Sequence, residues 1–443
     1  MKVEATYAQV WKIAFPIMLG SIAQTILNVT DTAFMARVGE APLAASAIGG
    51  VFYYVLVMVG ISFSIGAQIV MSRRAGEGDR EGLRTTFQQA FILLSLTGLL
   101  LFFVGHFGVH WLFEYTINDA EVRDQAVTFV VYRSYGLLLL VPLLSVRAFL
   151  VGISETKLIT VQSVISCVVN VVIGYVLIFG KGGSTAMGIA GAGIASAIAE
   201  WVSSLFVLFV VRYYKKFNAY QLFYKLASHG AVIKNMLHVS FPVLMQNTLS
   251  MGAWLLFFML IEKLGTHELA ISNVVRAVYM ILMTPVFGFS SAANAMTANL
   301  IGQGRTEDVR GLLIKITIFS VSIISVLALV SVLFTNQILG VVTNDAATII
   351  DARLSFYIVC AASVSLAVSL VLLSAVSGSG ATRAALVIEF VNIAIYVAFI
   401  YICCIHLKTK VEIVWLSEIL YWVLMGAMAY FYLRSGKWKS IKV

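Results

Sequence analysis

The chain has 443 residues, of which 60% are hydrophobic and only 12% are charged, and its mean hydropathy is +0.95. Soluble domains are about half apolar and a quarter charged, so this composition excludes an ordinary soluble protein. The net charge of +9 comes from cations scattered over many loops, which argues against a nucleic-acid partner, since such a surface gathers its cations on one face.

Apolar runs of about twenty residues recur along the chain, and each is long enough to span a bilayer. We therefore predict an all-α polytopic membrane protein. The first run lacks a small-residue cleavage site, so we interpret it as a membrane helix and not as a removable signal peptide. The twelve expected transmembrane helices lie near residues 10–36, 44–72, 86–113, 122–152, 156–180, 187–212, 235–262, 267–300, 311–334, 350–377, 384–405 and 411–433.

The distribution of Lys and Arg over the short loops predicts the orientation. With the N-terminus inside, twenty of these cations fall on the inner side and six on the outer side. The inner set includes Lys225, in the middle of the chain, and Lys442, near its end. We therefore expect a multi-pass protein of the cell (inner) membrane with both termini in the cytoplasm.

The two halves of the sequence resemble each other. A shift of 226 positions superimposes matching residues over some 140 residues: Phe15-Pro16 on Phe241-Pro242, Gly39 on Gly265, Tyr53 on Tyr279, Gly78 on Gly304 and Gly152 on Gly378. Each half holds six spans, an even number, so both halves start on the same side of the membrane and form parallel repeats. We predict two pseudo-symmetric six-helix bundles, 1–215 and 235–443, around a central cleft, joined by a cytoplasmic linker, 216–234. Transporters that work by alternating access are commonly built from two such bundles, which move against each other.

Several segments resemble the multidrug and toxic compound extrusion (MATE) family: "FPIMLGSIAQTILNVTDTAFMARVG", "SRRAGEGDREG", "FPVLMQN", "LIEKLG" and "NLIGQGRTEDVRG". The end of the first span, Thr30-Asp31-Thr32, and "GIAGAGIASAIAEW" in the sixth are similar to the DinF-type branch. The resemblance covers essentially the whole chain. It implies export of varied, often cationic, organic compounds in exchange for protons or sodium ions.

Asp31 is a carboxylate inside the first expected span. Ser21, Gln24, Asn28 and Asp31 are spaced 3, 4 and 3, so they share one helical face. A carboxylate facing lipid costs several kcal/mol, and therefore this face meets protein or water. Burial disfavours the charged form, so Asp31 is predicted to bind and release protons or to ligate Na⁺. The alternative is a structural carboxyl group that joins helices. The repeat favours coupling, because the equivalent position in the second half is Phe257.

The family resemblance implies that Asp31 is the coupling carboxylate. In the DinF-type branch the fifth helix often carries an Asn followed four residues later by an Asp, and this chain has Asn170 but Gly174. The departure puts a two-acid proton relay in doubt. Glu200 in the sixth span either compensates or has a separate structural role. A Na⁺ site at Asp31 and Asn170 also stays open.

Further residues are predicted to line the substrate cleft. Soft aromatic and methionine side chains accept many shapes, and the polar Gln246 and Asn247 follow Pro242 closely. For each of them, packing in the core or against lipid is the alternative. We also expect Arg276 to pair with a carboxylate, since unpaired intramembrane charges are costly. The predicted cleft residues are Gln24, Asn28, Tyr53, Gln246, Asn247, Trp254, Arg276 and Met280.

The sequence gives little support to the hypothesis that the protein is an enzyme. The four cysteines lie in apolar spans without metal-ligand spacing, and the chain has neither an HExxH motif nor a phosphate-binding loop. We expect no enzyme and no cofactor, with energy supplied by a proton or sodium gradient. The expected partners are small organic molecules and the lipid bilayer, and we expect a monomer. The main alternative function is a flippase for a lipid-linked or amphiphilic substrate, and a channel is the third.

Overall fold

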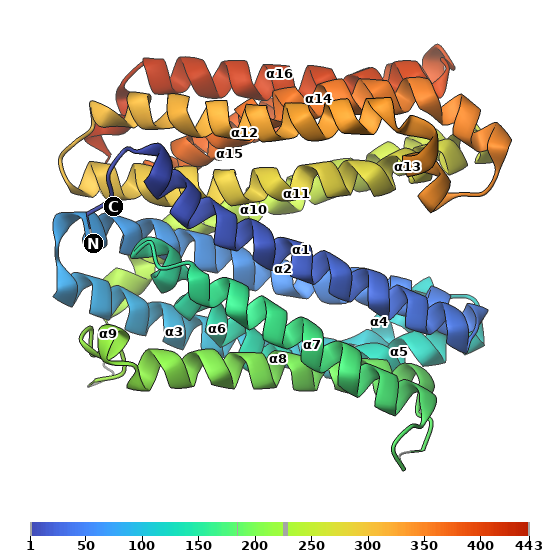
Figure 1. The fold of residues 1–443 in the computed structure, drawn as a ribbon, viewed down its shortest axis with the longest axis horizontal. Coiled ribbons are helices and arrows are strands. Elements are labelled where there is room, and N and C mark those ends of the chain that lie inside the picture. The colour runs from blue at the N-terminus through green and yellow to red at the C-terminus, as the bar shows by residue number, and fades with distance from the viewer. Residues whose placement is uncertain (1, 184, 225–228, 442–443) are drawn as a thin grey trace. The chain divides into compact units, whose positions relative to one another are not determined.

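The computed structural model describes residues 2–183, 185–224 and 229–441, and Figure 1 shows that helices joined by loops dominate them. Lys225, Lys442 and part of the expected linker 216–234 lie outside the described residues. The main helices are α1 (Tyr7–Val38), α2 (Glu40–Glu77), α3 (Arg80–Phe103), α4 (Val109–Thr116), α5 (Ala120–Ser134), α6 (Leu137–Gly152), α7 (Lys157–Phe179), α8 (Gly188–Tyr213), α9 (Lys215–Asn218), α10 (Gly230–Glu262), α11 (Thr266–Gly302), α12 (Asp308–Leu333), α13 (Thr335–Val342), α14 (Ala346–Gly378), α15 (Thr382–Tyr401) and α16 (Val411–Arg434). Three short helical segments accompany them: the π-helical η1 (Val104–Gly108) and η2 (Ile402–His406), and the 3₁₀ helix η3 (Lys437–Ser440).

The expected membrane spans appear as helices. Within the described residues, eleven helices are long and apolar enough to cross a membrane, and a twelfth span results when α5 and α6, bent by 51°, count as one. The π-helical segment η1 continues α3 into α4, so these three elements make a single span. The prediction of an all-helical protein with twelve spans is confirmed.

The described chain forms two compact units. The N-terminal unit comprises Leu19–Ser240, and the C-terminal unit comprises Met1–Met18 together with Phe241–Val443. Helices α1 and α10 each change from one unit to the other. Both changes lie beside a proline within the helix, Pro16 in α1 and Pro242 in α10. A proline removes one backbone hydrogen bond and weakens a helix locally, which makes these two positions natural boundaries.

The first residues of the chain therefore pack in the C-terminal unit. The backbone N–H of Val3 donates to Asn299 Oδ1 at 3.1 Å. The rings of Tyr7 and Phe319 meet edge to face with centroids 5.1 Å apart. Aromatic pairs in this geometry are stabilising, so this terminal segment is held by specific contacts.

Each unit is built around a central helix. In the N-terminal unit α2 packs against α3, α5 and α6, while α7 packs against α8. In the C-terminal unit α14 packs against α11, α12 and α16. The side chains that face these contacts are small or apolar and buried, as expected for helix pairs that approach closely in a membrane.

The internal repeat extends to local backbone geometry. Gly78 follows α2 with φ 78°, and Gly304 follows α11 with φ 76°. Both are in the left-handed region, which favours glycine because it has no Cβ. The two positions are related by the same shift of 226 residues that aligns the halves of the sequence.

Candidate functional site

Asp31 lies on α1 at the end of an exposed polar stripe. Gln24 and Asn28 are exposed, and Gln24 Nε2 donates to Asn28 Oδ1 at 3.5 Å. Asp31 is half-buried one turn further along the same face. Among the described residues its carboxylate takes part in no hydrogen bond or ion pair. The carboxylate is therefore available to an incoming ion.

Glu200 on α8 and Tyr53 on α2 form a hydrogen-bonded pair. The Tyr53 hydroxyl donates to Glu200 Oε2 at 2.7 Å. The carboxylate lies against Gly136, at the bend between α5 and α6, where a Cβ would overlap Glu200 Oε2. Glycine at this position makes room for the acid. Tyr53, which we expected to line the cleft, is instead buried at 3% exposure and belongs to this pair.

Arg133 on α5 supplies the positive charge of this region. Its Cζ lies 4.5 Å from the centre of the Tyr53 ring and 5.4 Å from that of Phe129, both within cation–π range. It also interacts electrostatically with both Asp31 and Glu200. In the described structure its buried Nε has no hydrogen-bond partner. We call Asp31, Glu200, Arg133 and Tyr53 the N-terminal polar cluster.

The charge balance of this cluster favours binding of one cation. With both carboxylates ionised and Arg133 positive, the three charges sum to −1. In a low-dielectric membrane interior, a net charge is costly. One proton, one Na⁺ or one organic cation would bring the cluster to neutrality.

Arg133 is not among the site residues predicted from the sequence. The available signal was a charge well inside the expected span 122–152, which is a functional candidate by default. What the sequence does not give is its neighbours, because Asp31, Tyr53 and Glu200 come from three other helices.

Asn170 on α7 is buried beside α8. Its Nδ2 donates to Ser196 Oγ at 3.0 Å, whereas no described residue donates to its Oδ1. A Cβ on Gly174 would lie 3.7 Å from Phe34 and 3.8 Å from Ala195, so this position faces α1 and α8. No hydrogen bond joins Asp31 to Asn170 within the described chain. The oxygens of both side chains are nevertheless the hard ligands that Na⁺ prefers, so this site stays a prediction.

The remaining predicted cleft residues lie in the C-terminal unit. Trp254 stacks on Phe257 with centroids 5.7 Å apart and packs against the apolar core. Gln246 and Asn247 on α10 are half-buried, and Met280 on α11 is exposed. Their assignment to a substrate cleft remains a prediction.

The expected ion pair of Arg276 is wrong for the part of the chain that the structure describes. No described carboxylate pairs with it, and its Cζ instead lies 4.9 Å from the centre of the Phe258 ring. An aromatic face attracts a guanidinium, so the ring replaces the expected acid.

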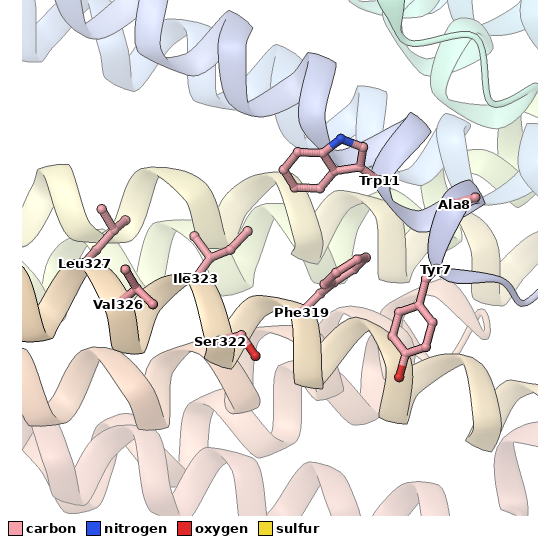
Figure 2. A pocket seen from close by; sticks show the side chains of 8 residues that line it. All are labelled: Tyr7, Ala8, Trp11, Phe319, Ser322, Ile323, Val326 and Leu327. Atoms are coloured by element: carbon pink, nitrogen blue, oxygen red, sulfur yellow. The ribbon is translucent and has the colours of Figure 1, made fainter.

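An apolar groove lies on the C-terminal unit, lined by residues of α1 and α12 (Figure 2). Its volume is about 670 Å³. Trp11 of α1 and Phe319 of α12 face each other between its two ends (Figure 2). Neither the polar cluster nor any predicted cleft residue lines it. Its lining residues are Tyr7, Ala8, Trp11, Phe319, Ser322, Ile323, Val326 and Leu327.

The MatE family model matches the chain twice, over residues 16–176 and 242–402. The chain belongs to this family. The two matches begin at Pro16 and Pro242, 226 residues apart, so the family model follows the repeat found in the sequence. MATE proteins are transporters and not enzymes, and the long apolar helices agree with a multi-pass membrane protein.

Known MATE proteins resemble this transporter over almost its full length. The probable multidrug resistance protein NorM of Thermotoga maritima is 22% identical over 433 residues, covering 97% of this chain and 92% of the relative. A solved multidrug resistance MATE family transporter of the MOP superfamily, in an outward-facing conformation, has a TM-score of 0.90 at 17% identity, covering 97% of this chain and 95% of that one. A MOP superfamily transporter from Pyrococcus furiosus has a TM-score of 0.89 at 18% identity over 97% of this chain and 95% of that one. The structures establish the shared fold.

Proposed function

We propose that this MATE transporter is a secondary active multidrug efflux antiporter. It exports organic, often cationic, compounds in exchange for H⁺ or Na⁺ by alternating access, with Asp31 as the coupling carboxylate. Its relatives named as multidrug resistance proteins support the substrate class. The DinF-type branch, the inner-membrane location, the cytoplasmic termini, the absence of a bound cofactor and a monomeric state belong to the same proposal.

The observation that carries the proposal is the combination of charge and access at Asp31. The side chain is half-buried at the end of the exposed stripe of Gln24 and Asn28. It also interacts electrostatically with Arg133 and Glu200. A cationic substrate and a coupling cation would each neutralise the same net charge of −1, so only one of them is held favourably at a time. This competition is what exchange requires.

The test is dye efflux from proteoliposomes that contain the purified transporter, with ethidium as the probe. An imposed proton gradient and an imposed Na⁺ gradient are applied in turn to wild type and to Asp31→Asn. We expect one gradient to drive efflux by wild type and the variant to lose it without a loss of expression. Asp124→Asn is the control, because Asp124 is an exposed carboxylate on α5 that pairs with its neighbour Arg123.

Normal gradient-driven efflux by Asp31→Asn would contradict the coupling role. If neither gradient moves ethidium in wild type, the flippase alternative replaces the antiporter, and Asp31 becomes a structural carboxyl group. Movement of the dye without a fixed ion stoichiometry would instead indicate a channel.

A further inference from the structure

The C-terminal unit carries an arginine well inside a membrane span. Arg276 on α11 is half-buried, and it is the only charged residue of the sequence between Glu268 and Arg305. It lies eight residues from Glu268, which is about 12 Å along the helix axis. This depth is well inside the roughly 30 Å hydrocarbon layer of a bilayer, so the guanidinium lies below the level of the lipid headgroups.

No acid of the described structure compensates the charge of Arg276. No described carboxylate pairs with it, and no described residue accepts a hydrogen bond from it. The two buried acids of the same unit have other partners: Glu418 accepts from two tyrosines and a tryptophan, and Glu389 accepts from a serine and a tyrosine. Arg133 in the N-terminal unit differs, because it interacts electrostatically with two carboxylates of its polar cluster. Arg276 therefore leaves one positive charge without a counter-ion.

An aromatic platform holds the guanidinium without neutralising it. The Cζ of Arg276 lies over the ring of Phe258, 4.9 Å from its centre. Phe258 in turn meets Trp254 and Phe257 edge to face, with ring centroids 5.3 and 5.2 Å apart. The cation–π contact is attractive, but it supplies no negative charge. The planar N–H donors of the guanidinium remain available to an acceptor that can take two of them at once.

The face of α11 that carries Arg276 is open. Asn273 and Met280, one turn to either side, are both exposed. The repeat shows the same feature in the N-terminal unit, where the position equivalent to Arg276 is Gly50 and an added Cβ would have no atom within 4 Å. A guanidinium that faces lipid chains costs several kcal/mol, so this face meets water. A dissolved compound can therefore reach the guanidinium.

We propose that Arg276 binds the carboxylate of small aromatic compounds and so extends the substrates of this transporter from organic cations to organic carboxylates. The guanidinium donates two parallel hydrogen bonds to the carboxylate, the geometry that arginine favours. The aromatic part of the compound packs on Met280, whose flexible thioether suits varied rings. A monocarboxylate brings the uncompensated charge to neutrality. This inference deepens the proposed function, on which it rests.

The test compares two ligands that differ only in charge, dansylglycine and its amide, dansylglycinamide. Binding to the purified full-length protein in detergent is followed by dansyl fluorescence, with empty micelles as the blank and no ion gradient. The ratio of the two dissociation constants isolates the carboxylate. Wild type is compared with Arg276→Gln and Arg276→Lys. Arg310→Gln is the matched control, because it removes one positive charge from an exposed position near the start of α12.

We expect wild type and Arg310→Gln to bind dansylglycine more tightly than the amide. Arg276→Gln should lose at least tenfold in affinity for dansylglycine and keep its affinity for the amide. Arg276→Lys should retain part of the preference, because an ammonium keeps the charge but lacks the planar pair of donors. An unchanged preference in Arg276→Gln, or an equal loss for both ligands, would overturn the proposal. If Arg276→Gln does not fold, an unchanged preference in Arg276→Lys overturns it.

A lipid headgroup is the competing occupant, and thermal unfolding distinguishes it, since a ligand of the folded state raises the unfolding midpoint. If short-chain phosphatidylglycerol, and not dansylglycine, raises the midpoint of wild type but not that of Arg276→Gln, the guanidinium binds lipid and the proposal is overturned. The binding assay uses no gradient. Its failure therefore leaves the test of gradient-driven ethidium efflux untouched, and a failure of efflux leaves the ligand preference measurable.

Discussion

Replacing Gly136 by Ala tests how the fold accommodates Glu200. Gly136 has φ −60° and ψ −35°, at the bend between α5 and α6, a conformation that alanine adopts readily. The added Cβ would overlap Glu200 Oε2 and lie 3.1 Å from the carbonyl oxygen of Arg133. The carboxylate must therefore move, and its 2.7 Å hydrogen bond from Tyr53 is lost.

Two effects oppose each other in this variant. Alanine favours helical backbone over glycine by about 1 kcal/mol. Loss of a hydrogen bond to a carboxylate costs about 1.5–3 kcal/mol. The second effect is larger, so we expect Gly136→Ala to lower the free energy of unfolding by about 0.5–2 kcal/mol.

The assay is reversible unfolding in mixed SDS and detergent micelles, followed by tryptophan fluorescence. Gly50→Ala in α2 is the matched control, because no atom lies within 4 Å of its added Cβ. It should stabilise the protein by up to about 1 kcal/mol. In a Glu200→Ala background, Gly136→Ala should cease to destabilise. Equal destabilisation in both backgrounds would refute the assignment to Glu200 and implicate the Arg133 carbonyl.

Other contacts give three further expected outcomes. Tyr53→Phe should cost about 1–3 kcal/mol, and much less in a Glu200→Ala background. A double-mutant cycle that shows no coupling between Tyr53 and Glu200 would contradict their hydrogen bond. The Thr348 hydroxyl and nearby backbone amides hold the pKa of exposed Asp345 below its usual range. The ionised carboxylate therefore contributes its full stabilisation above the unfolded pKa of about 3.9 and loses it as the pH falls through the folded pKa. The stability difference between wild type and Asp345→Ala should accordingly be constant from pH 8 to 5 and vanish towards pH 2. A stability difference that persists at pH 2 would contradict this role of Asp345, which caps the N-terminus of α14. Arg276→Ala should cost about 0.5–2 kcal/mol in unfolding, the range of a cation–π contact, and a cost of 3–5 kcal/mol would reveal a buried ion pair.

The spans, the repeat and the polar face of α1 were predictable from the sequence. Span length is fixed by the thickness of the bilayer, and helical spacing alone puts Gln24, Asn28 and Asp31 on one face. The hydrogen bond between Gln24 and Asn28 is a local consequence of that spacing. These features depend only on residues close in the chain, or on the constant shift of 226 positions that aligns the two halves of the sequence.

The partners of the buried acids were not predictable. Tyr53 and Glu200 are 147 residues apart, and Tyr279 and Glu418 are 139 apart. Their meeting depends on how each helix is rotated about its axis, and apolar residues surround every span too evenly to indicate that rotation. Arg276 shows the same limit, since an aromatic ring replaced the acid expected from its charge.

The division of α1 between the two units has a consequence for biosynthesis. Lys315 Nζ donates to the backbone carbonyl of Ala5 at 2.6 Å, across 310 residues of sequence. At about 5–20 residues per second, the ribosome needs roughly 15–60 s to make this partner after the N-terminus has emerged. The contact of Ala5 with Lys315 therefore forms only after more than two thirds of the 443 residues have been made.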